Sequence, residues 1–301
     1  MDPISVTVRR GAEVESVHRV HAVLVRDGEV ADAAGDPKVV TFMRSAAKPF
    51  QALALAEAVP ELTAEELAIA CASHEALHDQ LRAVERLLAR AHARDADLEC
   101  GPVDGSRVRH NCSGKHAGML LRCRLNGWET GGYRLAGHPL QQALGAEIGV
   151  AAEVPEAEIA TGVDGCGVVT YALPLRAMAA MFARLVRGEL AGADRVAAVM
   201  REHPELVGGP DADDTVLMQA IPGAIAKRGA EGVLCAALPD GTGFALKVED
   251  GANRAVRPAL GALLGVEALA SAPVRNSRGD EVGEIVPSGS KSTLALFHTR
   301  S

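Results

Sequence analysis

The stretch MRSAAKPF, residues 43–50, places a serine three residues before a lysine. A neutral lysine amine can take the proton of a serine hydroxyl, so Ser45 and Lys48 are a candidate nucleophile and its base. Residues three apart on a helical turn share one face. The same spacing recurs at Ser288 and Lys291 in PSGSKST, which is typical of a loop. An ordinary bend into a helix is therefore the alternative interpretation of Ser45 and Lys48.

A lysine base needs a pKa well below its ordinary value, because near pH 7 only about one lysine in a thousand is neutral. Burial or a second cation nearby lowers that pKa. Lys247, between apolar residues in the strand-like FALKVEDG, is a candidate for the second cation. The alternative is a strand residue that faces water. The catalytic interpretation thus predicts that Lys48 is buried or lies close to a second cation.

Three further stretches combine reactive side chains with glycines or loop residues. CASHE, residues 71–75, places Ser73 after an apolar segment, although an ordinary polar loop would look the same. HNCSGKHAG, residues 110–118, precedes an apolar helix and suggests an anion site at a helix N-terminus or a metal site. TGVDGCGVV, residues 161–169, has the glycine content expected where backbone segments approach closely. Cys112 and Cys166 lack CxxC partners, which excludes a zinc finger, and each alone could be a core cysteine.

The elements that must position these residues form two groups. Residues 3–42 contain β-branched runs typical of strands, with Asp27-Gly28 as a hairpin turn. From about 49 to 222 the pattern is helical, and Thr63 with Glu66 has the spacing of a capping box. Strands return in GVLCAALPDGTGFALKV, with a turn at Asp240-Gly241, followed by a helix near 252–265 and by GEIVP and TLALF.

This order predicts an α+β fold with a mainly antiparallel sheet built from both ends of the chain. We expect one domain over residues 1–301, with the sheet from about 1–42 and 231–300 and a helical region from about 43–230. The length and the hydrophobic content of 48% allow a sizeable core.

Charge and hydropathy exclude several classes of partner. The formal charge of −8 and the isoelectric point near 5.7 argue against nucleic acid and against an anionic membrane surface. No apolar run is long enough to span a bilayer, and MDPISVTVRRG lacks the features of a signal peptide. We therefore expect a cytoplasmic protein, whose six cysteines are thiols or metal ligands rather than a disulfide framework.

Taken in order, RSAAKPFQ, CASHE, HNCSGKHAG, VDGCGV and ALKVEDG resemble the rhizobial-type, or class 3, L-asparaginases over roughly residues 10–295. The resemblance implies a fold similar to serine β-lactamases, penicillin-binding proteins and glutaminases, and a homodimer. It implies two Ser–Lys tandems, Ser45 with Lys48 and Ser73 with Lys247. It also implies a metal site, usually zinc, at Cys112, Lys115 and Cys166, which assists substrate binding rather than the chemistry.

The implied reaction is hydrolysis of the side-chain amide of L-asparagine. Because this substrate is a zwitterion, its ammonium needs a carboxylate and its carboxylate needs donors, for which Asp164, His116 and Arg44 are the candidates. A glutaminase or a β-lactam-binding enzyme would also suit the pattern. One methylene separates asparagine from glutamine, and a pocket distinguishes them by only about 1–3 kcal/mol. A non-catalytic zinc-binding homologue is the alternative from a different class.

Overall fold

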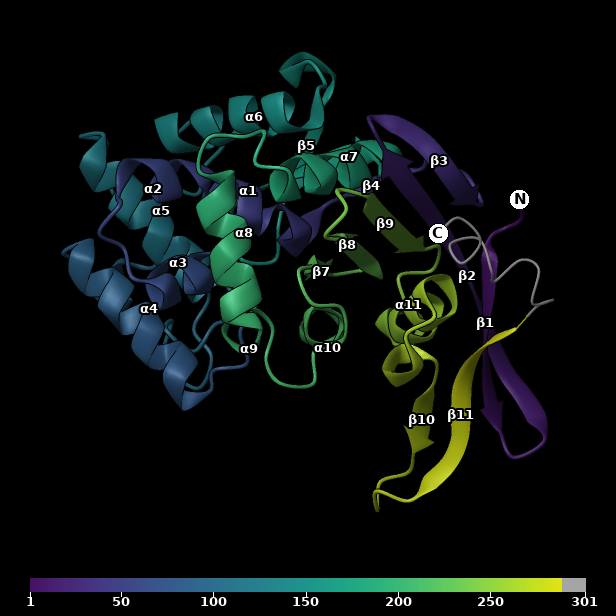
Figure 1. Ribbon diagram of the computed structural model, residues 1–301. Helices are drawn as coiled ribbons and strands as arrows, with labels where there is room; N and C mark the ends of the chain where they lie inside the picture. Colours follow the sequence, from purple (N-terminus) through teal and green to yellow (C-terminus); the bar gives the residue numbers. More distant parts are fainter. Residues whose placement is uncertain (289–301) are drawn as a thin grey trace.

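Strands from the two ends of the chain pair side by side in one antiparallel sheet (Figure 1). The structure, a computed structural model, describes residues 1–288. The strand order is β10-β11-β1-β2-β9-β8-β7, and β3 pairs with β2 off this path. The strands are β1 (Ile4–Arg10), β2 (Glu13–Arg26), β3 (Glu29–Ala34), β7 (Ile225–Gly229), β8 (Val233–Ala237), β9 (Gly243–Val248), β10 (Ala272–Arg275) and β11 (Glu281–Ser288).

The turns that join these strands follow from local sequence. Asp27 and Gly28 both adopt positive φ angles, 51° and 80°, as a two-residue hairpin between β2 and β3 requires. Gly241 also has a positive φ angle, 86°, in the turn between β8 and β9. The predicted hairpins at these two positions are confirmed.

Helices fill the middle of the chain and cover the sheet. Helix α7 packs against β2, β8 and β9, and α11 packs against β1, β9 and β11. A Cβ on Gly243 would lie 2.0 Å from the Ala179 carbonyl oxygen, so only glycine allows β9 to approach α7 this closely. The longer helices are α3 (Ala64–Ala70), α4 (His78–Arg90), α5 (Ser113–Leu125), α6 (Pro139–Ala152), α7 (Leu175–Val186), α8 (Ala193–Glu202), α10 (Asp213–Ala220) and α11 (Val256–Leu264).

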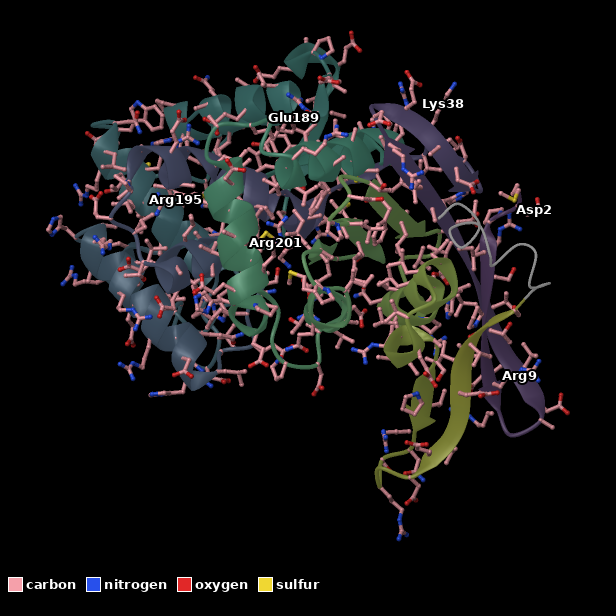
Figure 2. The ribbon with its side chains drawn as sticks, viewed as in Figure 1. Asp2, Arg9, Lys38, Glu189, Arg195 and Arg201 are labelled. Atoms are coloured by element: carbon pink, nitrogen blue, oxygen red, sulfur yellow. The ribbon has the colours of Figure 1, made fainter. Side chains whose placement is uncertain are left out.

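The helical layer is joined by caps and by long basic side chains. Thr63 and Glu66 form the predicted capping box at the start of α3. Arg195 on α8 donates hydrogen bonds to the carbonyl oxygens of Val59 and Leu62, which lie beyond the end of α2 (Leu53–Ala58), and Figure 2 shows its place. Within the described residues, no helix is both long and apolar enough to cross a bilayer.

The predicted α+β class, with an antiparallel sheet from both termini and helices between, is confirmed. Two details differ. A second, three-stranded sheet in the order β4-β6-β5 takes two of its strands, β5 and β6, from the region expected to be helical, and β7 starts before the expected boundary near 231. The strands of the second sheet are β4 (Val40–Phe42), β5 (Ala160–Val163) and β6 (Val169–Pro174). Lys291 and the predicted strand TLALF lie outside the described residues.

Candidate active site

Ser45 and Lys48 lie on one short helical turn. Ser45 belongs to the 3₁₀ turn η1 (Arg44–Ala47), and Lys48 begins α1 (Lys48–Gln51) although a proline follows it. The Lys48 amide donates to the Ser45 carbonyl, so the two side chains are stacked three residues apart. Arg44, just before Ser45, has a φ of 52°, a strained value for a non-glycine residue. Such strain is often found where a reactive side chain must be presented.

The amine of Lys48 reaches Ser73 in the interior. Its Nζ lies 3.0 Å from the Ser73 Oγ and 2.6 Å from the Ala72 carbonyl oxygen. Lys48 is fully buried, and burial is the main cause that lowers its pKa below the ordinary value. The structure therefore brings together three predicted residues, Ser45, Lys48 and Ser73, and places Lys48 where a neutral amine is favoured.

A second lysine near Lys48 is Lys227, which sequence analysis missed. Its Nζ lies 3.0 Å from Asp214 Oδ2, and both side chains have no exposed surface. Burial lowers the pKa of Lys227 to about 8; Asp214 opposes this shift, and the charge of Lys48 adds to it. Lys227 is thus a second buried lysine whose pKa responds to Lys48, while the cation that lowers the pKa of Lys48, after burial, is Lys115.

Strand order explains why Lys227 reaches this site. It lies on β7, the last strand of the sheet path, and β7 packs against η1. A Cβ on Gly229 would lie 2.6 Å from the Met43 carbonyl oxygen, so the end of β7 is in direct contact with the segment that carries Ser45. A usable sequence signal existed in Lys227-Arg228-Gly229, because K-T-G accompanies S-x-x-K in penicillin-binding enzymes.

The structure does not bring Lys247 to these residues. Its Nζ donates to the carbonyl oxygens of Glu231 and Val248, at 2.7 Å from the first. These groups belong to the turn between β7 and β8 and to the end of β9. Lys247 therefore binds backbone carbonyl oxygens at the end of the sheet, and its place in the second tandem stays a prediction, with Lys227 as the alternative that the geometry offers.

His74, next to Ser73, is held in one neutral tautomer. The Ala76 amide donates to Nδ1 at 3.1 Å, so the proton resides on Nε2, which donates to the Ser113 Oγ at 2.7 Å. The Ser113 hydroxyl in turn donates to the Val108 carbonyl oxygen at 2.7 Å. With both nitrogens occupied, His74 positions the Ser73 loop and is not free to act as a base.

We expect His74 to make the protein acid-sensitive. Burial lowers its pKa from 6.5 to about 4, so between these values the unfolded state binds a proton that the folded state refuses. Stability therefore falls as pH falls from about 6.5 to about 4, by up to about 3 kcal/mol. Urea unfolding of wild type and His74→Asn at several pH values measures this contribution. An identical pH slope for both proteins would contradict it.

The three predicted metal ligands lie together beside this site. Cys112, Lys115 and Cys166 are all buried, and Lys115 Nζ lies 3.1 Å from Cys166 Sγ. Gly114 makes this possible, because a Cβ there would lie 2.1 Å from the Ile69 carbonyl oxygen and would push α5 away from α3.

The charges around these ligands favour a metal-binding thiolate. A hydrogen bond from Cys166 is the main cause that holds the pKa of Cys112 well below its usual range; burial opposes it. Burial disfavours the ammonium form of Lys115, but the two cysteines outweigh it and raise its pKa. Within residues 1–288, no group of three His, Cys, Asp or Glu side chains could hold a metal. A cluster of two thiols and an amine is nevertheless a donor set that fits zinc.

The residues predicted to bind the substrate's charged groups have other contacts. Arg44 Nε donates to Asp164 Oδ1 at 2.6 Å, and the Asp164 side chain is only 9% exposed. This ion pair holds the strained Arg44 backbone beside Ser45. His116 has no exposed surface, and its Nδ1 lies 2.6 Å from the Tyr133 hydroxyl. Arg44 and Asp164 thus satisfy each other, with the Arg44 side chain 25% exposed, whereas the buried His116 Nε2 has no hydrogen-bond partner among the described residues.

A cavity of about 370 Å³ opens beside the two serines. Arg44, Asp164, His116 and Lys247 are not among its lining residues, so their roles at the substrate stay predictions. A larger cavity of about 710 Å³ lies between α4 and α8 and contains none of the predicted site residues. The smaller cavity is lined by Ser45, Ser73, His74, Glu75, Asn111, Asp213, Arg228, Gly229, Ala230, Val233, Asn253 and Val256.

Comparison with known proteins identifies the family. A family model described as L-asparaginase II matches residues 6–287. The chain belongs to the L-asparaginase II family. Membership indicates an asparagine amidohydrolase, and it confirms the resemblance inferred from the five sequence motifs. A search of curated proteins gives no match.

Solved structures give weaker similarities. EstCE1, a hydrolase with promiscuous acyltransferase activity, shares 10% identity with a TM-score of 0.41, over 76% of this chain and 88% of that one. Mglu in its native form in 4.3 M NaCl shares 20% identity with a TM-score of 0.36, over 77% of this chain and 56% of that one. Mglu in its glutamate form shares 19% identity with a TM-score of 0.34, over 77% and 57%.

Proposed function

We propose that this member of the L-asparaginase II family hydrolyses L-asparagine to L-aspartate and ammonia, with Ser45 as the nucleophile. The observation that carries the proposal is the contact between the buried Lys48 amine and Ser73 beside Ser45, at the wall of one cavity. In such a cluster a burial-depressed amine can take a serine proton, which is the role that a general base needs to perform.

In the first half of the reaction, the Ser45 hydroxyl attacks the side-chain amide carbon of asparagine. The hydroxyl proton passes to the neutral Lys48 amine and, through the Ser73 hydroxyl, to the departing nitrogen. The C–N bond breaks, ammonia leaves, and an aspartyl ester remains on Ser45. In the second half, water attacks the ester carbon, its proton returns through the same groups, and L-aspartate leaves.

Lys227 supports this proton transfer by its charge. It is paired with Asp214 in the interior, and the charge of Lys48 lowers its pKa. By the same repulsion, we expect Lys227 to disfavour the ammonium form of Lys48. Backbone amides at the cavity wall near Ser45 would stabilise the oxyanion, and losing one such donor typically costs about 100- to 1000-fold in rate.

Ammonia release from L-asparagine by the purified protein tests the proposal. We expect turnover of L-asparagine and slower turnover of L-glutamine. Absence of turnover with both amides would favour the non-catalytic zinc-binding homologue, and faster turnover of L-glutamine would favour a glutaminase. The family resemblance also implies a homodimer, which the mass in solution measured by light scattering tests.

Zinc is the metal that we propose Cys112, Lys115 and Cys166 bind. When bound, it would supply a positive charge that helps to hold the substrate. The lysine must lose its proton to bind the metal, so zinc affinity should increase with pH. The chemistry proposed above uses only side chains of the chain itself.

We expect Cys112→Ala and Cys166→Ala each to lose most of the zinc found in the wild-type protein, because each removes a thiolate ligand. Metal content after dialysis, measured by plasma mass spectrometry, gives the result. The matched control is Cys123→Ala, which replaces a buried cysteine within α5 and should leave the zinc content unchanged. Equal metal content in all four proteins would remove the zinc site from this account.

A further inference from the structure

Three charged side chains line the cavity beside Ser45: Glu75, Asp213 and Arg228. These side chains, rather than the Arg44–Asp164 pair, are available at the cavity wall for the two charged groups of a substrate. Asp213 is already held by Arg257, whose Nε lies 2.7 Å from its Oδ1 and whose Nη2 also donates to Asp211. Glu75 and Arg228 form the looser pair, with Oε1 and Nη2 3.3 Å apart.

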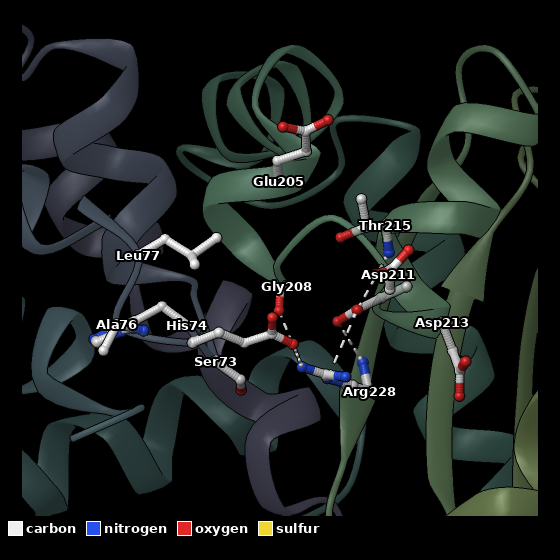
Figure 3. A network of polar contacts seen from close by, with 12 residues as sticks. Ser73, His74, Ala76, Leu77, Glu205, Gly208, Asp211, Asp213, Thr215 and Arg228 are labelled. Atoms are coloured by element: carbon white, nitrogen blue, oxygen red, sulfur yellow. Dashed lines mark hydrogen bonds and ion pairs between the residues drawn. The ribbon is translucent and has the colours of Figure 1, made fainter. Parts of the chain in front are cut away.

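The Glu75–Arg228 pair is accessible and weakly held. The two side chains are 43% and 33% exposed, so their ion pair contributes at most about 1 kcal/mol. Figure 3 shows Arg228 between Ser73 on one side and Asp213 on the other. A small ligand in the cavity can therefore separate this pair at low cost.

Arg228 is fixed from behind by the protein. Its backbone amide donates to Asp214 Oδ2 at 3.1 Å, and Nη2 donates to the Gly208 carbonyl oxygen at 3.0 Å (Figure 3). Asp214 is fully buried and also pairs with Lys227, so the strand that carries both cations has little freedom. The guanidinium would thus keep its place when Glu75 turns to another partner.

Glu75 has an anchored backbone, while its side chain is held by the exposed pair with Arg228. Its amide donates to Gln80 Oε1 at 2.9 Å, and Gln80 Nε2 donates to the Glu205 carbonyl oxygen at 2.8 Å. A Cβ on Gly209 would lie 2.4 Å from the Glu75 carboxyl carbon, so the missing side chain leaves room for this carboxylate.

We propose that Glu75 and Arg228 exchange their mutual contact for the two charged ends of the substrate. Glu75 accepts the α-ammonium and Arg228 donates to the α-carboxylate of a free α-amino acid amide. One ion pair is broken and two are formed, and the cavity gains no net charge. Asparagine within a peptide lacks both charges and is rejected. This assignment rests on the proposed function and adds the residues that select the substrate class.

Glu75→Gln and Arg228→Gln separate the two contacts when three amides are compared. L-asparagine carries both charges, succinamate lacks the ammonium, and 3-aminopropanamide lacks the carboxylate. Glu75→Gln should lower kcat/KM for L-asparagine by about 10- to 100-fold and change succinamate by less than about threefold. Arg228→Gln should lower kcat/KM for both L-asparagine and succinamate, and it should leave kcat/KM for 3-aminopropanamide nearly unchanged. Glu202→Gln, an exposed glutamate of α8, is the control.

Affinity for L-aspartate, measured by calorimetry, gives a readout that does not require turnover. We expect each variant to bind it at least about tenfold more weakly than wild type, with no change in Glu202→Gln. Equal losses of kcat/KM on all three amides, or an unchanged affinity of the variants for L-aspartate, would overturn the assignment of Glu75 and Arg228. The proposed function would still hold in that case if the wild-type protein releases ammonia from L-asparagine. A wild-type protein that binds L-aspartate through Glu75 yet releases no ammonia would overturn only the proposed function.

Discussion

Ser45→Ala is expected to lower kcat for L-asparagine by on the order of 10⁴- to 10⁶-fold, because it removes the atom to which the acyl group is transferred. The hydroxyl group is small and Ser45 is partly exposed, so the fold should be unaffected. Initial rates of ammonia release, with thermal unfolding of the same preparation, measure both effects.

The control for this prediction is Ser271→Ala, an exposed serine just before β10, which should keep full activity. Ser73→Ala should lower the rate by about 10²- to 10⁴-fold, because it interrupts proton transfer but leaves the nucleophile. Activity within tenfold of wild type in Ser45→Ala would contradict the nucleophile assignment.

Lys227→Met is expected to lower kcat by about 10²- to 10⁴-fold, whereas Lys247→Met should stay within about threefold of wild type. The two lysines have similar sequence surroundings, but only Lys227 lies near Lys48. Without Lys227, we expect Lys48 to lose the repulsion of one nearby cation, so that a larger share of it is protonated. Lys115, which also lowers the pKa of Lys48, is unchanged in this variant. Ammonia release by both variants at pH 7.5 compares them.

Loss of Lys227 also leaves Asp214 buried without its partner, which destabilises a protein by about 3–5 kcal/mol. The double variant Lys227→Met with Asp214→Asn removes both charges and keeps an acceptor for the Arg228 amide. It should recover most of the stability without recovering activity. Wild-type activity in this double variant, or a large loss in Lys247→Met, would show that Lys227 is not the second lysine.

Local patterns predicted the parts of the site that are close in sequence. Ser45 and Lys48 share one helical turn, so their spacing indicated that they lie close together, although an ordinary bend suited the same pattern. The capping box at Thr63 and the hairpin at Asp27-Gly28 were likewise set by neighbouring residues. The family resemblance added Ser73 and the three residues of the metal cluster, which the structure brings together.

Contacts between segments that are distant in the sequence could not be predicted from local patterns. Lys227 and Lys247 both lie in short strands among apolar residues, and only the order β9-β8-β7 decides which strand reaches η1. The glycines of TGVDGCGVV indicated that backbone segments approach closely, but not that the ends of this stretch pair as strands β5 and β6. Arg44 and Asp164 were expected at the substrate; each satisfied the charge of the other, which a sequence pattern does not reveal.

The central claim is that an aspartyl ester forms on Ser45 during turnover. Acid quenching of the protein a few milliseconds after mixing with L-asparagine, followed by peptide mass mapping, tests it most directly. The account predicts one added aspartyl group on the peptide that contains Ser45, and none in Ser45→Ala. An ester on the peptide that contains Ser73, with Ser45 unmodified, would contradict it.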